Sequence, residues 1–186
     1  MYCLATSLPL TIHLLMCIML QDMPVPLSFG VASMTSNDFL AYPMDGILGL
    51  GRPASNAVEY PTAMEAIQDM GKLQSNILGV HIQRGSSGSA DGELNFGALD
   101  STRYTGDLSY TDTVPDGTMW EIPIEDAGFN GTFCKFEGKS AIVDTGTSYN
   151  LLPPDDAKQL HGQIPRFEQN GEVFHIPCST TKPIGM

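Results

Sequence analysis

The chain has 186 residues, of which 42% are hydrophobic, so it can bury a core in one domain or in two small ones. Nine basic residues against 21 acidic ones give a formal net charge of −12, which argues against nucleic acid as a partner because phosphates require basic patches. The 19 glycines and 13 prolines indicate many short strands joined by turns, which predicts an all-β fold.

Residues 1–23 are mostly apolar and form a leader whose origin the sequence leaves open. We consider, in order of preference, an unrelated leader from an alternative start or a retained intron, a signal-like segment, and a membrane span. A signal peptide has a basic region before its apolar stretch, but the first Lys or Arg here is Arg52. Polar residues interrupt the ~20 apolar residues that a span requires, so no stable membrane span is expected.

Apolar runs bounded by turn residues predict four strands in the next part of the chain, at residues 26–32, 47–49, 77–82 and 93–97. A Gly- and Ser-rich stretch separates the last two runs, which predicts a hairpin. The short run at 47–49 ends at a glycine and follows an Asp-Gly turn.

Two helices are predicted, at residues 60–73 and 153–160. The first has apolar residues at helical spacing, with Pro61 in its first turn and Gly71 at its end. The second begins with two prolines followed by Asp155 and Asp156, whose charges suit the positive end of the helix dipole. Both acids are interpreted as helix-end charges rather than catalysts.

The second half of the chain predicts further strands at residues 108–113, 119–124, 128–136 and 172–178. The third of these contains Asn130-Gly131-Thr132, the only N-x-[ST] triplet in the sequence. Such a triplet marks a surface loop in a secreted chain, and it also arises by chance.

The most informative stretch places one carboxylate in a turn. Residues 141–143 predict a buried strand that ends at Asp144. Gly146 permits tight backbone geometry, and the hydroxyls of Thr145 and Thr147 lie close to the acid in sequence. An Asp-Thr-Gly turn at a strand end is also common without any chemical role.

Several motifs stand in a fixed order along the chain. They are Tyr42-Pro43-Met44-Asp45-Gly46-Ile47-Leu48-Gly49-Leu50-Gly51, Gly92-Glu93-Leu94-Asn95-Phe96-Gly97, Tyr104-Thr105-Gly106, Trp120-Glu121-Ile122 and Asp144-Thr145-Gly146-Thr147-Ser148. Together they resemble the pepsin-like aspartic proteases (peptidase family A1). The resemblance extends from about Val25 to Ile184 and implies a bilobal all-β fold that is incomplete in both lobes. Residues 24–103 would be a remnant of the N-terminal lobe, and residues 104–186 a partial C-terminal lobe.

The resemblance implies an aspartic endopeptidase in which two Asp carboxylates activate a water that attacks the peptide bond. Asp144 would be one of them, Thr145 and Gly146 would shape its loop, and Thr147 would face the substrate or support the acid. Asp144-Thr145-Gly146 is the only D-[TS]-G in the sequence, so this chain is expected to be a fragment. The alternative is an inactive fragment or a binding module with a partial pepsin-like fold.

The expected partner is a peptide or protein substrate. A homodimer of retroviral type is disfavoured, because there the apolar-apolar-Gly element follows the acid, whereas residues 47–49 precede Asp144. The Gly49-Leu50-Gly51 run also matches part of a dinucleotide-binding pattern, but no strand-helix-strand alternation follows it. No cofactor is expected.

The chain has four cysteines and four scattered histidines without metal-ligand spacing, so no metal site is expected. The family resemblance implies a disulfide in the second lobe, for which Cys134 and Cys178 are the candidate pair within this sequence. A cysteine beyond Met186 would be an alternative partner, because pairing depends on geometry that sequence does not specify. The resemblance also implies an extracellular or vacuolar location.

Overall fold

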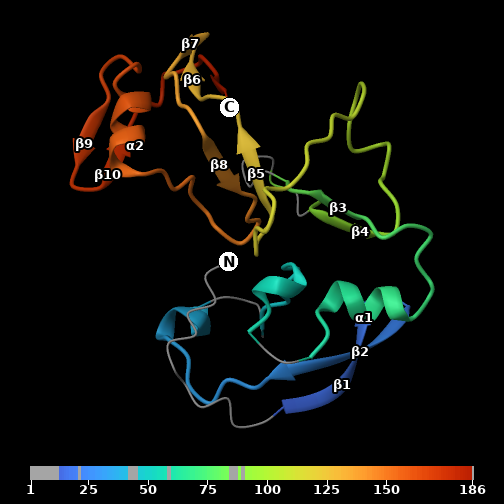
Figure 1. Ribbon diagram of the computed structural model, residues 1–186. Helices are drawn as coiled ribbons and strands as arrows, with labels where there is room; N and C mark the ends of the chain where they lie inside the picture. The colour runs from blue at the N-terminus through green and yellow to red at the C-terminus, as the bar shows by residue number, and fades with distance from the viewer. Residues whose placement is uncertain are drawn as a thin grey trace. The chain divides into compact units, whose positions relative to one another are not determined.

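The computed structural model describes residues 13–20, 22–41, 46–57, 60–83, 88 and 91–185. These residues divide into two compact units, the first ending at Ser109 and the second beginning at Tyr110 (Figure 1). Both units consist mainly of short strands, with one α-helix in each, which confirms the all-β class. Residues 1–12 of the leader and 42–45 of the recognised motifs lie outside the described residues.

The first unit contains four strands, two 3-10 helices and one α-helix among its described residues. They are β1 (His13–Leu20), β2 (Met23–Gly30), η1 (Asn37–Ala41), η2 (Pro53–Ser55), α1 (Ala63–Asp69), β3 (Leu78–His81) and β4 (Glu93–Phe96). The strand predicted at 26–32 is present but starts earlier, at Met23.

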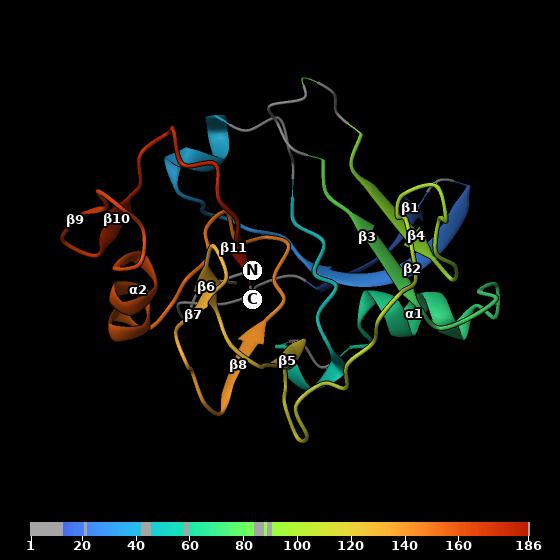
Figure 2. The ribbon, with the colours of Figure 1, turned by 90° about the horizontal axis from the view of Figure 1, so that it is seen from above.

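An antiparallel hairpin of β1 and β2 supports α1, and both views show the helix beside β2 (Figures 1 and 2). Val25 and Leu27 alternate with the exposed Pro24 and Pro26, so one face of β2 is buried. They pack against the buried face of α1, where Ile67 is fully buried. Complete burial of a side chain such as Val25 or Ile67 contributes about 1.5–3 kcal/mol. Sequence analysis did not predict β1, which lies in the apolar leader.

Thr62 caps α1 through a reciprocal pair of hydrogen bonds. Its hydroxyl accepts from the Glu65 backbone N–H at 3.3 Å, and its own N–H donates to the Glu65 carboxylate at 2.8 Å. The Thr62 N–H lowers the pKa of Glu65, and so does the Thr62 hydroxyl, which donates to the same carboxylate at 2.8 Å. Pro61 therefore lies before the helix and not in its first turn, while Gly71, at φ 63°, follows its end as predicted.

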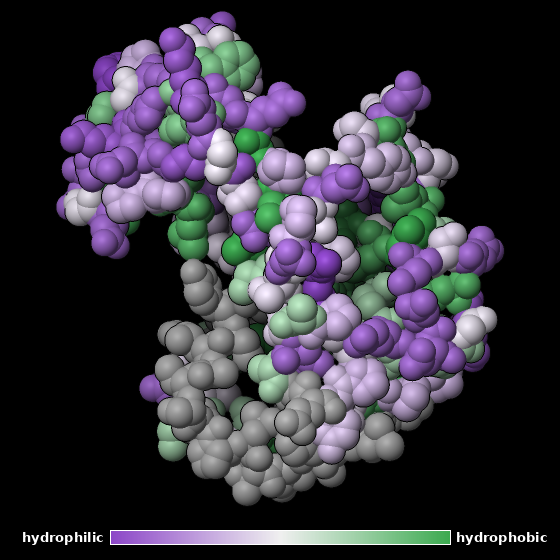
Figure 3. Space-filling view, viewed as in Figure 1, coloured by the Kyte–Doolittle hydropathy of each residue, from purple (hydrophilic) through white to green (hydrophobic). Residues whose placement is uncertain are grey.

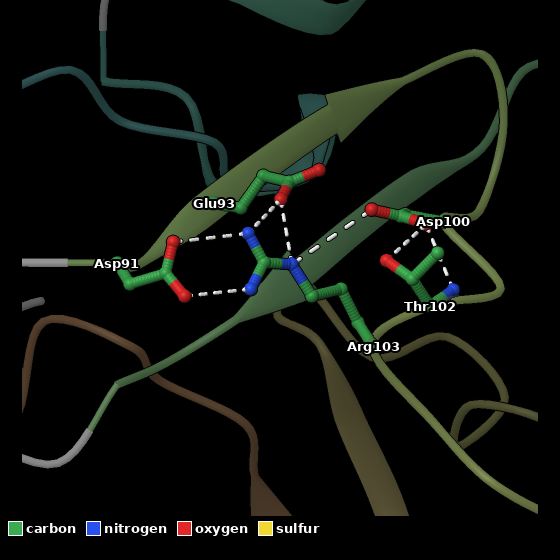
Figure 4. Close-up of polar contacts among 5 residues, drawn as sticks. All are labelled: Asp91, Glu93, Asp100, Thr102 and Arg103. Carbon is green, nitrogen blue, oxygen red and sulfur yellow. Dashed lines mark hydrogen bonds and ion pairs between the residues drawn. The ribbon is translucent and has the colours of Figure 1, made fainter.

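The predicted hairpin of β3 and β4 is confirmed, with Leu78 opposite Phe96 and His81 opposite Glu93. Beyond β4, Arg103 binds three carboxylates (Figure 4). Its guanidinium makes two parallel hydrogen bonds to Asp91, at 2.8 and 3.1 Å, and Nε donates to Glu93 at 2.7 Å. The third carboxylate, Asp100, lies 3.8 Å from Nε. The cluster joins the hairpin to the segment that leaves the first unit.

The second unit contains seven strands and one helix among its described residues. They are β5 (Glu121–Ile124), β6 (Gly128–Phe129), β7 (Thr132–Phe133), β8 (Lys139–Ile142), α2 (Pro154–His161), β9 (Glu168–Asn170), β10 (Val173–His175) and β11 (Ile184–Gly185). β5 pairs with β8, β9 with β10, and β6 lies between β11 and β7, all antiparallel. A small core forms where Leu160 of α2 packs with Ala127 and Cys134.

Two strand predictions were wrong, and a third segment is split into two strands. Residues 47–49 and 108–113 form no strand, and Ile47 and Leu108 are exposed. Neither segment pairs with another strand in the described part of the chain, and a strand is stabilised only by such pairing. The run at 128–136 is interrupted, because Asn130 and Gly131 form a turn between β6 and β7. Exposed apolar side chains recur over both units, as the green surface in Figure 3 illustrates.

Candidate active site

A strand pair leads directly to Asp144. β8 runs antiparallel to β5, with Ile142 opposite Glu121. The backbone N–H of Val143 donates to the Trp120 carbonyl at 2.8 Å, which extends the pairing by one residue. Asp144 is therefore the first residue after the strand pair. The pairing of the preceding residue, Val143, fixes where the Asp144 loop begins.

The Asp144 carboxylate is oriented by its own loop. One oxygen, Oδ1, accepts the backbone N–H of Gly146 at 2.8 Å, and Oδ2 accepts the Thr147 hydroxyl at 2.6 Å. A carboxylate that bonds the backbone two residues ahead forms an Asx turn, which gives this loop its tight geometry. Asp144 and Thr147 are half-buried, whereas Thr145 and Gly146 are exposed. The structure thus brings three of the four predicted residues together and leaves Thr145 at the surface.

The strand that carries Asp144 is not buried as predicted. Ile142 is 54% exposed and Val143 is 53% exposed. Apolar side chains downstream of the loop are also exposed, with Tyr149 at 80% and Leu151 at 67%. An apolar run indicates a strand that can be covered, but it does not specify what covers it. Asp144 is therefore flanked in sequence by exposed apolar side chains.

An ion pair closes the base of this loop, and sequence analysis did not find it. Lys139 at the start of β8 lies 2.7 Å from Asp156 in the first turn of α2, so the elements that flank the loop are joined. The Asp156 side chain is only 15% exposed. A pair of this kind contributes roughly 0.5–1 kcal/mol. The acids after Pro154 indicated a helix start, but nothing in the sequence indicated Lys139 as a partner.

Asp126 organises the chain before β8. Its carboxylate accepts backbone N–H groups of Ala127 at 2.7 Å, Lys135 at 2.9 Å and Phe136 at 3.0 Å. The Phe136 bond is the largest cause that lowers the pKa of Asp126. Lys135 has a positive φ of 63°, a conformation that needs such support in a residue with a Cβ. This role depends on residues nine and ten positions away, so no local motif indicated it.

The disulfide expected between Cys134 and Cys178 is absent, because both are free thiols. Cys134 is buried beside Leu160, where its sulfur accepts a hydrogen bond from Gln163 at 3.1 Å. Burial raises the pKa of the Cys134 thiol. Cys178 is exposed. Packing therefore keeps Cys134 as a small core residue.

Within the described ranges, no three His, Cys, Asp or Glu side chains gather as they would around a metal ion. The same residues include no helix that is long and apolar enough to cross a membrane.

Comparison with known proteins identifies the relatives of this chain. A family model described as eukaryotic aspartyl protease matches residues 17–184, so the match begins inside the apolar leader. The chain is 48% identical over 164 residues to the aspartic-type endopeptidase ctsD of Aspergillus fumigatus. The matched residues cover 87% of this chain and 35% of that protein. It is 44% identical to the probable aspartic-type endopeptidase CTSD of Arthroderma otae, covering 84% of this chain and 41% of that protein.

A more distant relative is cathepsin D of Rattus norvegicus, which is 34% identical over 145 residues. That match covers 75% of this chain and 34% of the relative. The chain thus spans between 34% and 41% of the length of these three relatives.

Proposed function

Because the chain belongs to the eukaryotic aspartyl protease family, we propose that Asp144 is one of the two catalytic carboxylates of an aspartic endopeptidase. The observation that carries this proposal is the Asp144 loop, in which the backbone of Gly146 and the hydroxyl of Thr147 hold both carboxylate oxygens. The relatives from Aspergillus fumigatus and Arthroderma otae bear names of the same activity.

The chemistry requires two carboxylates that share one proton. The ionised carboxylate takes a proton from a water, the water attacks the peptide carbonyl carbon, and the protonated partner donates its proton to the carbonyl oxygen. Repulsion between like charges keeps one acid protonated, so the pair titrates as a unit. The sequence has one Asp-Thr-Gly, so the proposal requires a second carboxylate in addition to Asp144.

In this proposal the loop residues have distinct roles. Gly146 supplies a backbone N–H, and Thr147 orients Oδ2. Thr145 shapes the exposed side of the loop. The substrate is an extended, largely apolar peptide segment, a class that suits the exposed Val143, Tyr149 and Leu151, which flank the acid in sequence.

The finer location follows from the same proposal. An extracellular or vacuolar site that is acidic fits the 21 acidic residues, whose mutual repulsion falls when they are protonated.

A second candidate function is a binding module without catalysis. The observation that favours it is the single Asp-Thr-Gly of the sequence, because one carboxylate cannot share a proton with itself. Such a module would bind peptides through the same exposed apolar side chains around Asp144.

Cleavage of an unfolded protein substrate at about pH 3–5 tests the proposal, since a carboxylate pair is half-protonated in that range. The purified chain is assayed alone and after mixing with the part of the Aspergillus fumigatus relative that this chain does not match. We expect pepstatin-sensitive cleavage in the mixture and at least a hundredfold loss in Asp144→Asn, in line with the loss of a general acid–base group.

The matched control is Asp112→Asn, which removes an exposed carboxylate of the same unit and is expected to leave cleavage unchanged. Cleavage that survives Asp144→Asn would contradict a catalytic role for Asp144. Peptide binding without cleavage in either preparation would favour the binding module.

A further inference from the structure

The turn between β6 and β7 projects an acceptor sequence from the second unit. Phe129 pairs with Thr132, so Asn130 and Gly131 are the two turn residues. Their φ values of 50° and 80° are both positive, as a type I′ turn requires. An Asn-Gly pair is favoured in such a turn for conformational reasons alone, so its presence does not by itself indicate a further role.

Two other observations go beyond turn geometry. Thr132 follows the two turn residues, and a type I′ turn does not require any particular residue type there. It completes an N-x-T acceptor sequence. All three residues are exposed, and a Cβ added at Gly131 would meet no atom within 4 Å. At the base of the hairpin the two strands approach closely, because a Cβ at Gly128 would clash with the Thr132 carbonyl oxygen. The hairpin is therefore tightly packed at its base and open at its tip.

We propose that Asn130 is an N-glycosylation site that carries an oligosaccharide linked through N-acetylglucosamine. The backbone N–H of Asn130 already donates to the Pro183 carbonyl at 3.0 Å, so the main chain at the acceptor is anchored to the segment before β11. A glycan here projects from the turn and needs no rearrangement of the hairpin. The proposal does not depend on the role of Asp144.

The transfer uses a lipid-linked oligosaccharide pyrophosphate as donor. Nδ2 of Asn130 forms a bond to the anomeric carbon of the first N-acetylglucosamine, and the bond from that carbon to the phosphate oxygen breaks. The electron pair leaves with the lipid pyrophosphate, and the amide nitrogen gives one proton to a base of the transferase. The Thr132 hydroxyl is the group that the transferase recognises two residues after the acceptor.

The experiment expresses the full chain behind a cleavable signal peptide in a yeast secretory host. We expect one discrete increase in mass that peptide-N-glycosidase removes, converting Asn130 to Asp in the corresponding peptide. Thr132→Ala and Asn130→Gly should lose the increase completely, while Thr132→Ser should keep it. Asn130→Gly separates loss of the acceptor from misfolding, because glycine also accepts the positive φ of the turn.

Glu172→Thr on the Thr132→Ala background is the matched control. It creates an exposed Asn-Gly-Thr triplet at residues 170–172, where Asn170 is the last residue of β9 and residues 171 and 172 form the turn before β10. This variant is expected to show one removable glycan at Asn170, which demonstrates that the chain meets the transferase. An unmodified native chain beside a modified control would overturn the proposal. A glycan on the Asn130 peptide of the Thr132→Ala variant would also overturn the proposal, because that variant lacks the acceptor sequence.

Discussion

Packing determines how reactive the two thiols of the second unit are. Cys134 is buried and its pKa is raised by burial, so it forms less thiolate at a given pH than an ordinary cysteine. Cys178 is exposed. We expect iodoacetamide at about pH 8 to modify Cys178 in the native protein and Cys134 only after unfolding in urea. Peptide mass spectrometry measures both sites in one sample.

The same measurement tests the disulfide that family resemblance implies. If Cys134 and Cys178 were bonded, both would resist modification in urea until a reductant was added. A Cys134→Ser variant should leave the labelling of Cys178 unchanged if both thiols are free.

At the scale of elements, the Arg103 cluster joins the β3–β4 hairpin to the chain that follows it (Figure 4). Hydrogen bonds from Arg103 lower the pKa of Asp91, and those from Thr102 lower the pKa of Asp100; the charge of His81 adds to both shifts. The two carboxylates bind fewer protons in the folded than in the unfolded state. Their contribution to stability is therefore complete above about pH 4 and is lost as the pH falls through the lowered values.

Urea unfolding of the native chain and Arg103→Gln, followed by far-UV circular dichroism from pH 7 to pH 2, tests this. The native midpoint should be higher by a constant amount above about pH 4, and the difference should shrink at more acidic pH. The control Lys158→Gln removes an exposed charge from α2 and should shift the midpoint little at any pH. A difference that persists undiminished at pH 2 would contradict the role of the carboxylates. The cluster is thus expected to remain largely intact at the proposed working pH.

At the scale of the whole molecule, large apolar side chains stay exposed in both units, among them Ile82, Phe133 and Tyr149. Such surface favours association with another polypeptide. The division into lobe segments 24–103 and 104–186 stays a prediction.

The urea m value should therefore be lower than that of a fully packed chain of this length, because m scales with the surface exposed on unfolding. The native chain should also bind the dye ANS and associate with increasing concentration. Trp120 is the only tryptophan, so its fluorescence follows the second unit separately from the far-UV signal of both units. A full m value with a single sharp transition and no dye binding would contradict this account.

The sequence by itself determined what short segments encode. Asp144-Thr145-Gly146 and the motifs around it indicated the family. Apolar periodicity with Pro61 and Gly71 indicated α1, two prolines followed by acids indicated α2, and apolar runs around a Gly- and Ser-rich stretch indicated the β3–β4 hairpin. These features depend on neighbours within one turn or one hairpin, so the local order of residue types is sufficient to predict them.

Only the tertiary structure decided which distant groups meet and which apolar segments are covered. It placed Lys139 on Asp156 across 17 positions, and it left Cys134 and Cys178 as free thiols. It also left the strand before Asp144 exposed, although the same apolar run would suit a buried strand. Ion pairing, disulfide formation and burial require two segments to occupy the same space, and local patterns contain no information about the second segment.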